Sequence, residues 1–210
     1  MKILLLSRHV GAMAPFLAEA TGATPSSLHI GYIDDAQVAF SGAPFVQAES
    51  ESVEKLVHRV TRITTRETSP ARFDRMLAEF DAVYVASGST FALLEALQTT
   101  GNSAVLTEDV RKGLPYVGAS AGSIIAGPDV TPASLMDDPA DGPALTNFAG
   151  LAVIDKTIIP HADGQLPPYP LELIRRTLDT FGDKYPLISL RDDQALLVDG
   201  DTATVVHSSC

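Results

Sequence analysis

The sequence has a single cysteine, Cys210, which leaves no partner for an internal disulfide, no cysteine cluster for zinc and no internal cysteine nucleophile. It also lacks any stretch of about 18 apolar residues, the length of a membrane-spanning helix, so we expect a soluble protein. The apolar run near the start covers only Ile3 to Leu6. This is shorter than the roughly 7 to 15 residues of a signal-peptide core, so we expect a first β-strand there. The lone cysteine fits a reducing compartment, and we expect a cytoplasmic protein.

Basic residues are few compared with acidic ones. Lys and Arg number 15 against 26 Asp and Glu, and the formal net charge is −11 at pH 7. A field of this sign repels phosphate backbones and anionic lipid surfaces. We therefore expect neither nucleic acid nor a membrane as a partner.

Short apolar runs alternate with amphipathic stretches along the 210 residues. The predicted strands are 2–7, 27–33, 82–86, 114–118, 151–159 and 186–190, and the predicted helices lie near 11–20, 50–61, 70–80, 90–99 and 170–181, with another from Ser120. The alternation predicts an α/β fold: a single domain over 1–210 with a mainly parallel sheet flanked by helices. Segment 195–206 predicts a C-terminal β-hairpin at a sheet edge, turning at Asp199-Gly200.

The segment GASAG, residues 118–122, raises the question of whether Ser120 is a nucleophile or a spacer. It follows the apolar LPYV and precedes a predicted helix, which is the setting of a nucleophile elbow. The N–H of Ala121 would lie at a helix N-terminus, where unpaired donors favour negative charge. Small residues at such a turn also suit tight packing, so the motif alone does not decide whether Ser120 is a nucleophile or a spacer.

A serine nucleophile needs a base, and His161 is the best placed of the five histidines. It follows an apolar run and Pro160, so we expect it at the carboxyl end of a strand, where open α/β sheets place their ligand sites. The other histidines are His9, His29, His58 and His207. On position alone, a surface-loop histidine is an equally good reading of His161.

A catalytic histidine also needs a carboxylate that orients its ring, and its serine needs donors for the oxyanion. The irregular segment 127–147 offers Asp129, Asp137, Asp138 and Asp141, although loop aspartates commonly cap turns. Residues 87–89, Ser-Gly-Ser, form a second glycine turn between a predicted strand and a predicted helix. We expect the N–H of Gly88 to point into the same crevice as Ser120, as one donor of an oxyanion hole.

Motifs spread over most of the chain resemble those of the peptidase E (aspartyl dipeptidase) and cyanophycinase family of serine peptidases. The matching segments are ASGSTFALLEAL, GASAG, IIPH and DDQALLVDG. They are similar to the family's strand-loop-helix, its elbow, its strand ending in Pro-His and its late hairpin. The resemblance implies a fold like that of class I glutamine amidotransferases, with serine in place of their cysteine.

The resemblance also implies the roles of individual residues. Ser120 is the nucleophile, His161 is the base, and the amides of Gly88 and Ala121 form the oxyanion hole. The acid falls on Asp137, with Asp138 as its close rival because this loop is slightly longer than in peptidase E. The implied reaction is hydrolysis of a small peptide through an acyl-enzyme, with no metal and no cofactor, and a homodimer is left open.

The sequence departs from the family at its specificity residue. The arginine that binds an N-terminal aspartate is missing, and Pro170 stands in its place. Arg175 and Arg176 lie nearby, but arginines on an amphipathic helix usually face solvent. We therefore expect the preference for aspartate to be lost or weakened. Ser87 and Ser89 replace the family's Gly and Asn, and a backbone donor at Gly88 survives both changes.

Two other functions are alternatives to the peptidase. An α/β-hydrolase esterase has its triad in the chain order Ser, Asp, His, which is also the order of Ser120, Asp137 and His161. In that fold the acid is expected on a later strand, and the gap of 17 residues between Ser120 and Asp137 is too short for this. A non-catalytic, amidotransferase-like protein would only bind a small molecule in the crevice. The presence of both Ser120 and a well-placed His161 argues against it.

Overall fold

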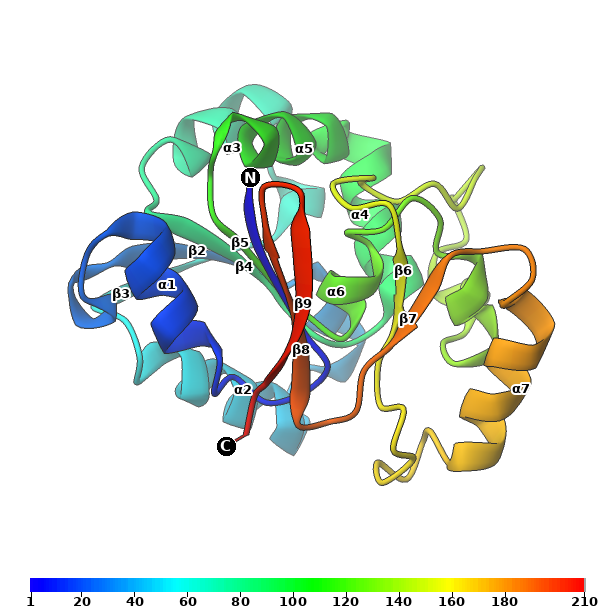
Figure 1. Ribbon diagram of the computed structural model, residues 1–210. Helices are drawn as coiled ribbons and strands as arrows, with labels where there is room; N and C mark the ends of the chain where they lie inside the picture. Colours follow the sequence, from blue (N-terminus) through cyan, green and yellow to red (C-terminus); the bar gives the residue numbers. More distant parts are fainter. Residues whose placement is uncertain (210) are drawn as a thin grey trace.

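The computed structural model describes residues 1–209, so Cys210 and the predictions made from it lie outside the described residues. A mainly parallel β-sheet forms the centre of this part of the chain (Figure 1). In spatial order its strands are β3 (Arg59–Ile63), β2 (His29–Ile33), β4 (Ala82–Val85), β5 (Tyr116–Ala119), β1 (Lys2–Leu6), β8 (Gln194–Asp199) and β9 (Thr202–His207). The first five are parallel, and β8 and β9 form an antiparallel hairpin at the edge. The predicted α/β fold with a C-terminal hairpin is confirmed.

Helices cover both faces of the sheet. The helices are α1 (Met13–Thr21), α2 (Pro44–Glu54), α3 (Pro70–Leu77), α4 (Thr90–Thr100), α5 (Asn102–Lys112), α6 (Ala121–Ile124) and α7 (Leu171–Phe181). Side chains of α3, α4, α5 and α6 share one apolar core with the sheet, and those of α1 and α2 share a second core. Figure 1 shows α3 and α5 side by side, with α1 and α2 on the opposite side of the sheet.

Strand β1 shows why the apolar runs form buried strands. Its side chains alternate between the two faces, so Ile3 and Leu5 enter the first core while Leu4 and Leu6 enter the second. All four are fully buried. A strand covered on both sides needs apolar residues at every position, which is the pattern that the sequence shows.

Part of the sequence-based assignment is wrong. The predicted helix 50–61 runs too far, because α2 ends at Glu54 and β3 begins at Arg59. The β-branched residues Val60, Thr61 and Ile63 favour a strand, and this strand pairs with β2 at the edge of the sheet. Helix α5 was not predicted. It follows α4 directly, with Gly101 in the left-handed conformation at φ 81° between the two helices.

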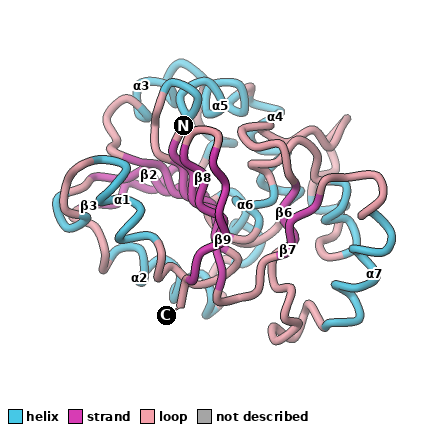
Figure 2. Tube along the Cα trace, viewed as in Figure 1, coloured by secondary structure: helices cyan, strands magenta, loops and turns pink. Residues whose placement is uncertain are grey.

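Strands β6 (Thr157–Ile159) and β7 (Leu187–Ser189) form a separate, parallel two-stranded sheet rather than extending the main one. Figure 2 shows this small sheet beside the main sheet, with α7 on its outer side. Only three residues of the predicted strand 151–159 are in β-structure. This second sheet matters for function because His161 follows β6.

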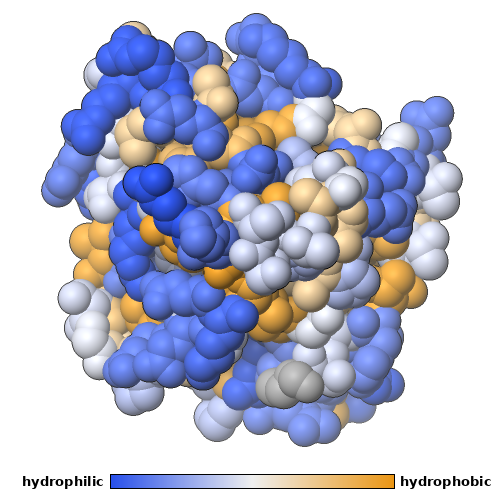
Figure 3. All heavy atoms as spheres, turned by 90° about the vertical axis from the view of Figure 1, so that its left-hand side faces the viewer, coloured by the Kyte–Doolittle hydropathy of each residue, from blue (hydrophilic) through white to orange (hydrophobic). Residues whose placement is uncertain are grey.

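One face of the molecule carries mostly hydrophilic side chains (Figure 3). Figure 3 shows the face on the side of α1 and β3, where hydrophilic side chains dominate and apolar ones lie between them. Over residues 1–209, no helix combines the length and apolar character needed to cross a membrane.

Candidate active site

Ser120 occupies a strained turn between β5 and α6. Its backbone has φ 46° and ψ −103°, a region that residues with side chains rarely adopt. Its N–H donates to the carbonyl of Leu6 at 3.0 Å, and the hydroxyl of Ser123 lies 2.7 Å from the same carbonyl oxygen. The turn therefore holds Ser120 in one orientation at the carboxyl end of the parallel strands, as the elbow motif predicts.

Glycine is required where this turn packs against the sheet. A Cβ atom on Gly122 would lie 2.1 Å from the carbonyl oxygen of Val85 at the end of β4, which is far inside van der Waals contact. The hydroxyl of Tyr116 donates to the carbonyl of Gly122 at 2.6 Å. Close packing and a buried hydrogen bond thus fix the start of α6 under Ser120.

His161 lies beside Ser120, as the sequence analysis expected. Its Nε2 is 3.1 Å from the Ser120 Oγ, and the two residues are only 3% and 9% exposed. The backbone of His161 also has a positive φ, 60°, and its N–H donates to the Ser7 Oγ at 2.8 Å. Strand β6 and the end of β1 therefore place the imidazole against the elbow.

The other ring nitrogen of His161 meets Asp192. The distance from Nδ1 to Oδ1 of Asp192 is 2.7 Å, and Asp192 is only 5% exposed. Because an ionised carboxylate only accepts hydrogen bonds, Nδ1 carries the proton and Nε2 is left to accept from the hydroxyl of Ser120. The side chains of Ser120, His161 and Asp192 thus form one continuous hydrogen-bonded chain.

Asp192 also forms an ion pair with Arg8, whose Nη1 lies 2.9 Å from its Oδ2. Burial alone would raise the pKa of Asp192, but the hydrogen bonds from His161 and Arg8 outweigh it and hold this pKa below its ordinary value. A depressed pKa means that the pairing stabilises the fold above the unfolded-state pKa, near 3.9, and that this contribution is lost as the pH falls through the folded pKa. Asp192 is therefore ionised at neutral pH.

The structure does not bring Asp137, the predicted acid, into a hydrogen bond with His161. Asp137 accepts from the N–H and hydroxyl of Thr90 and from the hydroxyl of Tyr169, the last at 3.1 Å. Burial raises its pKa, although the hydrogen bonds from Thr90 and Tyr169 act in the opposite direction. Its link to His161 is indirect, because the ring of Tyr169 stacks on the imidazole with centroids 4.8 Å apart.

The rival aspartates of the loop are engaged elsewhere. Asp138 is exposed and accepts from the N–H of Ala140, which caps a short 3-10 turn. Asp129 accepts from the N–H of Thr131, and Asp141 accepts from the hydroxyl of Ser89. They cap turns or hold neighbouring loops.

The two predicted oxyanion donors lie in suitable local structures. Ala121 is the first residue of α6 and is fully buried beside Ser120. Gly88 has φ 133°, a conformation that favours glycine. Within residues 1–209, the N–H groups of Gly88 and Ala121 have no backbone or side-chain acceptor, whereas the N–H groups of Ser87 and Ser89 do. These two donors remain available to a ligand.

Asp192 was not among the candidate residues drawn from the sequence, although it lies against His161. It follows the predicted strand 186–190 just as His161 follows 151–159, and β6 and β7 pair in parallel. The carboxyl ends of paired parallel strands lie side by side, so the rule that singled out His161 also points to Asp192.

Residues 1–209 contain no group of three or more His, Cys, Asp or Glu that could hold a metal ion.

The fold and this geometry agree with known proteins. A family model described as peptidase family S51 matches residues 6–206. An uncharacterized peptidase of Pasteurella multocida is 29% identical over 83% of this chain and 76% of that protein. Peptidase E of Streptomyces coelicolor is 36% identical over 61% of this chain and 53% of its own length.

A solved structure is similar over nearly its whole length. The crystal structure of a protein from Listeria monocytogenes EGD-e, described as a peptidase E protein, covers 99% of this chain and 98% of that chain, with a TM-score of 0.86 and 23% identity. A peptidase from an acI-B1 Actinobacterium has a TM-score of 0.71 at 16% identity, over 98% of this chain and 87% of that chain. At these identities the likeness concerns the fold. The family model, which spans nearly the whole chain, carries the assignment: the chain belongs to peptidase family S51 and is a serine-type peptidase.

Proposed function

We propose that Ser120, His161 and Asp192 form a catalytic triad that hydrolyses a peptide bond of a small substrate, such as a dipeptide, in the cytoplasm. The observation that carries this proposal is the buried chain of hydrogen bonds from the Ser120 Oγ through both ring nitrogens of His161 to Asp192. Each contact has the length that proton transfer or ring orientation requires.

The mechanism follows from which atoms can give and accept protons. The Ser120 Oγ attacks the carbonyl carbon of the scissile bond while its proton passes to Nε2 of His161. The N–H groups of Gly88 and Ala121 stabilise the oxyanion. His161 then protonates the leaving amine, the carbon–nitrogen bond breaks, and an acyl-enzyme remains. Water repeats the sequence: it attacks the acyl carbon, its proton goes to His161, and Ser120 leaves with that proton.

Asp192 acts through His161 in this mechanism. As an ionised carboxylate it holds the imidazole in the tautomer with the proton on Nδ1, and it stabilises the imidazolium that forms during each proton transfer. The chain order is Ser120, His161, Asp192. An α/β-hydrolase has the order Ser, Asp, His, so the geometry disfavours the esterase alternative.

The first test is covalent labelling of the nucleophile. A fluorophosphonate is expected to modify Ser120, because its phosphorus is attacked by an activated serine and the product resembles the tetrahedral intermediate. Mass spectrometry of a digest would identify the labelled residue. Ser120→Ala should remain unlabelled, and Ser26→Ala, at an exposed serine, serves as a second serine variant that keeps the nucleophile. Labelling elsewhere, or no labelling of the folded protein, would count against the proposal.

Among the described residues, the two arginines that line the pocket beside the triad are already paired. A pocket of about 480 Å³ opens beside Asp192, lined by Arg8, His9, Asp163, Gln165, Arg191, Asp192 and Asp193. Arg8 pairs with Asp192 and Arg191 pairs with Asp193. Arg175 and Arg176, on α7, are exposed. A substrate carboxylate would have to compete with an existing partner.

We therefore expect only weak preference for N-terminal aspartate. A buried carboxylate without a cationic partner costs several kcal/mol, and a protein of net charge −11 provides no general attraction. In a comparison of kcat/KM for dipeptides with N-terminal Asp, Ala, Leu or Arg, Asp should lead by no more than about tenfold, which corresponds to about 1.4 kcal/mol. A hundredfold lead for Asp would contradict this and would make Arg175 and Arg176 the next residues to replace.

A further inference from the structure

The turn 87–89, which carries the proposed oxyanion donor Gly88, is held by contacts on both sides of that residue. A Cβ atom at Gly88 would lie 2.2 Å from the carbonyl oxygen of Ala36, so the turn packs directly on this segment. The N–H of Ser89 donates to the same carbonyl at 2.9 Å. The hydroxyl of Ser89 donates to Asp141 at 2.7 Å. These contacts fix the turn on the side that enters α4.

Glu49 of α2 holds the other side of the turn. Its Oε1 accepts from the N–H of Ser87 at 3.0 Å and from the hydroxyl of Tyr84 at 2.8 Å. Its Oε2 accepts from the hydroxyl of Ser87 and from the side-chain amide of Gln37 at 2.8 Å. The carboxylate of Glu49 therefore receives hydrogen bonds from the backbone and the side chain of the residue directly before Gly88.

This carboxylate is unusual because all four of its donors are neutral. Burial raises the pKa of Glu49, and the hydrogen bonds from Ser87, Tyr84 and Gln37 counter that effect. A buried carboxylate is expensive when no cation balances it, and such groups are concentrated at functional sites. Because Glu49 lies beside the turn 87–89, we connect this energetic cost with the function of the turn.

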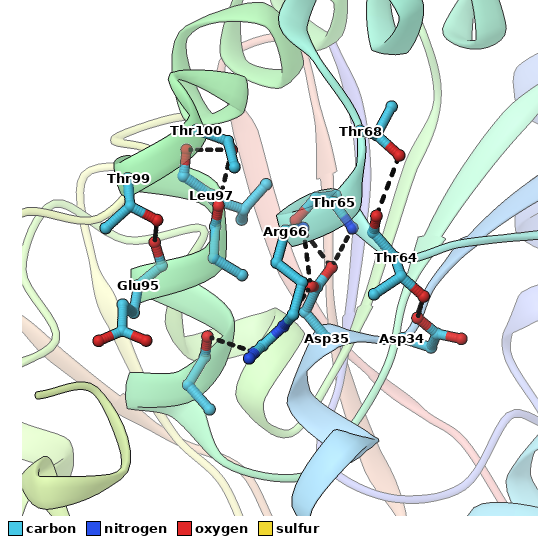
Figure 4. Close-up of polar contacts among 12 residues, drawn as sticks. Asp34, Asp35, Thr64, Thr65, Arg66, Thr68, Glu95, Leu97, Thr99 and Thr100 are labelled. Carbon is cyan, nitrogen blue, oxygen red and sulfur yellow. Dashed lines mark hydrogen bonds and ion pairs between the residues drawn. The ribbon is translucent and has the colours of Figure 1, made fainter. Parts of the chain in front are cut away.

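The segment under the turn is itself held rigidly. Ala36 belongs to the 3-10 helix η2 (Asp35–Phe40), whose first residue, Asp35, is fully buried. Asp35 accepts from the N–H and hydroxyl of Thr65 at 2.6 Å and 2.7 Å and pairs with Arg66 at 3.2 Å. Figure 4 shows the side chains of Asp35 and Arg66 pointing toward one another. Arg66 also donates to the carbonyl of Ala92 in α4, so η2 is tied to the helix that follows the turn.

We propose that Glu49 is a positioning residue of the oxyanion hole, which fixes the peptide between Ser87 and Gly88 so that the N–H of Gly88 faces the substrate oxygen. This inference rests on the proposed function of Gly88. Glu49 occupies the N–H of Ser87 and Ala36 occupies that of Ser89, which leaves the N–H of Gly88 as the free donor of the turn. The hydroxyl of Ser87 gives Glu49 a second contact that a glycine at this position lacks.

The test compares three substitutions on α2. Glu49→Ala removes the acceptor and should lower kcat by about tenfold to hundredfold, less than the roughly 10² to 10³ for deleting a donor outright, with KM within about twofold of wild type. Glu49→Gln should retain most of kcat, because its amide oxygen can still accept from the N–H of Ser87. Glu54→Ala, on the same helix and half exposed, should leave kcat unchanged.

A second readout separates positioning from general loss of structure. A peptide aldehyde forms a hemiacetal with Ser120 and uses the oxyanion hole, whereas the amino acid released as the leaving amine does not. In Glu49→Ala the aldehyde should bind more weakly by the same factor as kcat falls, while product inhibition stays unchanged. If Glu49→Ala does not fold, Glu49→Asp, which is shorter by one methylene, should show the same paired losses.

Three results would overturn the inference about Glu49: wild-type kcat in folded Glu49→Ala or Glu49→Asp, equal losses for aldehyde and product, or a Glu49→Gln variant as impaired as Glu49→Ala. Fluorophosphonate labelling of Ser120 in the wild-type protein distinguishes these results from failure of the proposed function. If Ser120 is labelled and Glu49→Ala retains full kcat, only the role of Glu49 is wrong. If Ser120 is not labelled, the catalytic assignment itself fails.

Discussion

Replacing Ser120 with alanine is expected to lower kcat by on the order of 10⁶-fold, and replacing His161 with alanine should cost about the same. The reason is that the 3.1 Å contact between the Ser120 Oγ and Nε2 of His161 makes the two side chains one functional unit. Without the base the hydroxyl is a poor nucleophile, and without the hydroxyl the base has nothing to activate. The double variant should therefore be little worse than either single variant.

Steady-state kinetics on a dipeptide substrate, with circular dichroism to confirm folding, would check this prediction. His58→Ala is a suitable control because His58 is exposed, between α2 and β3. Additive losses in the double variant would show that the two residues act independently. Full activity in Ser120→Ala would remove Ser120 from the mechanism.

The placement of the nucleophile and the base could be predicted because their signals are local. Residues 118–122 predict a strand-to-helix turn from their own sequence. A histidine that closely follows a buried strand lies at the carboxyl end of that strand. In the structure the two residues lie side by side at these positions, with positive φ angles of 46° at Ser120 and 60° at His161. Contacts with the end of β1 then hold both residues in place: the N–H of Ser120 donates to the carbonyl of Leu6, and that of His161 donates to the Ser7 Oγ.

Asp192, the proposed acid, could not be found in the same way, because its position depends on a distant strand pairing. Asp192 meets His161 only because β6 and β7 pair in a small second sheet, which the sequence analysis did not anticipate. Resemblance to a family motif instead selected Asp137 in the loop after α6. The structure shows that Asp137 is half-buried and bonded to Thr90 and Tyr169.

The errors in secondary structure have a similar origin. The end of the predicted helix 50–61 is polar, as the exposed side of a helix would be. In the structure this segment is strand β3, because it pairs in parallel with β2, with His29 opposite Arg59. Tertiary pairing decides such short segments more than local propensity does. The strands β1, β2, β4 and β5 were predicted correctly because burial on both faces of the sheet requires nearly continuous runs of apolar residues.

Asp192→Asn is expected to lower kcat by roughly 10⁴-fold, while Asp137→Asn should cost far less. In Asp192→Asn the new side chain can present its amide NH₂ to Nδ1, which favours the tautomer with the proton on Nε2, and that nitrogen then cannot accept the proton of Ser120. In Asp137→Asn the new side chain keeps an oxygen for the N–H of Thr90, and the hydroxyl of Tyr169 can reorient. Stacking of Tyr169 on His161 should therefore survive.

Asp193→Asn is the matched control, because Asp193 is adjacent in the chain and its carboxylate pairs with Arg191 rather than with His161. It should retain nearly wild-type kcat. The pH profile adds a further criterion: since the pKa of Asp192 lies below its ordinary value, its protonation should affect wild-type activity only below about pH 4. A larger loss in Asp137→Asn than in Asp192→Asn would return the acid to the loop, and the contact between His161 and Asp192 would then serve only to hold the two strand ends together.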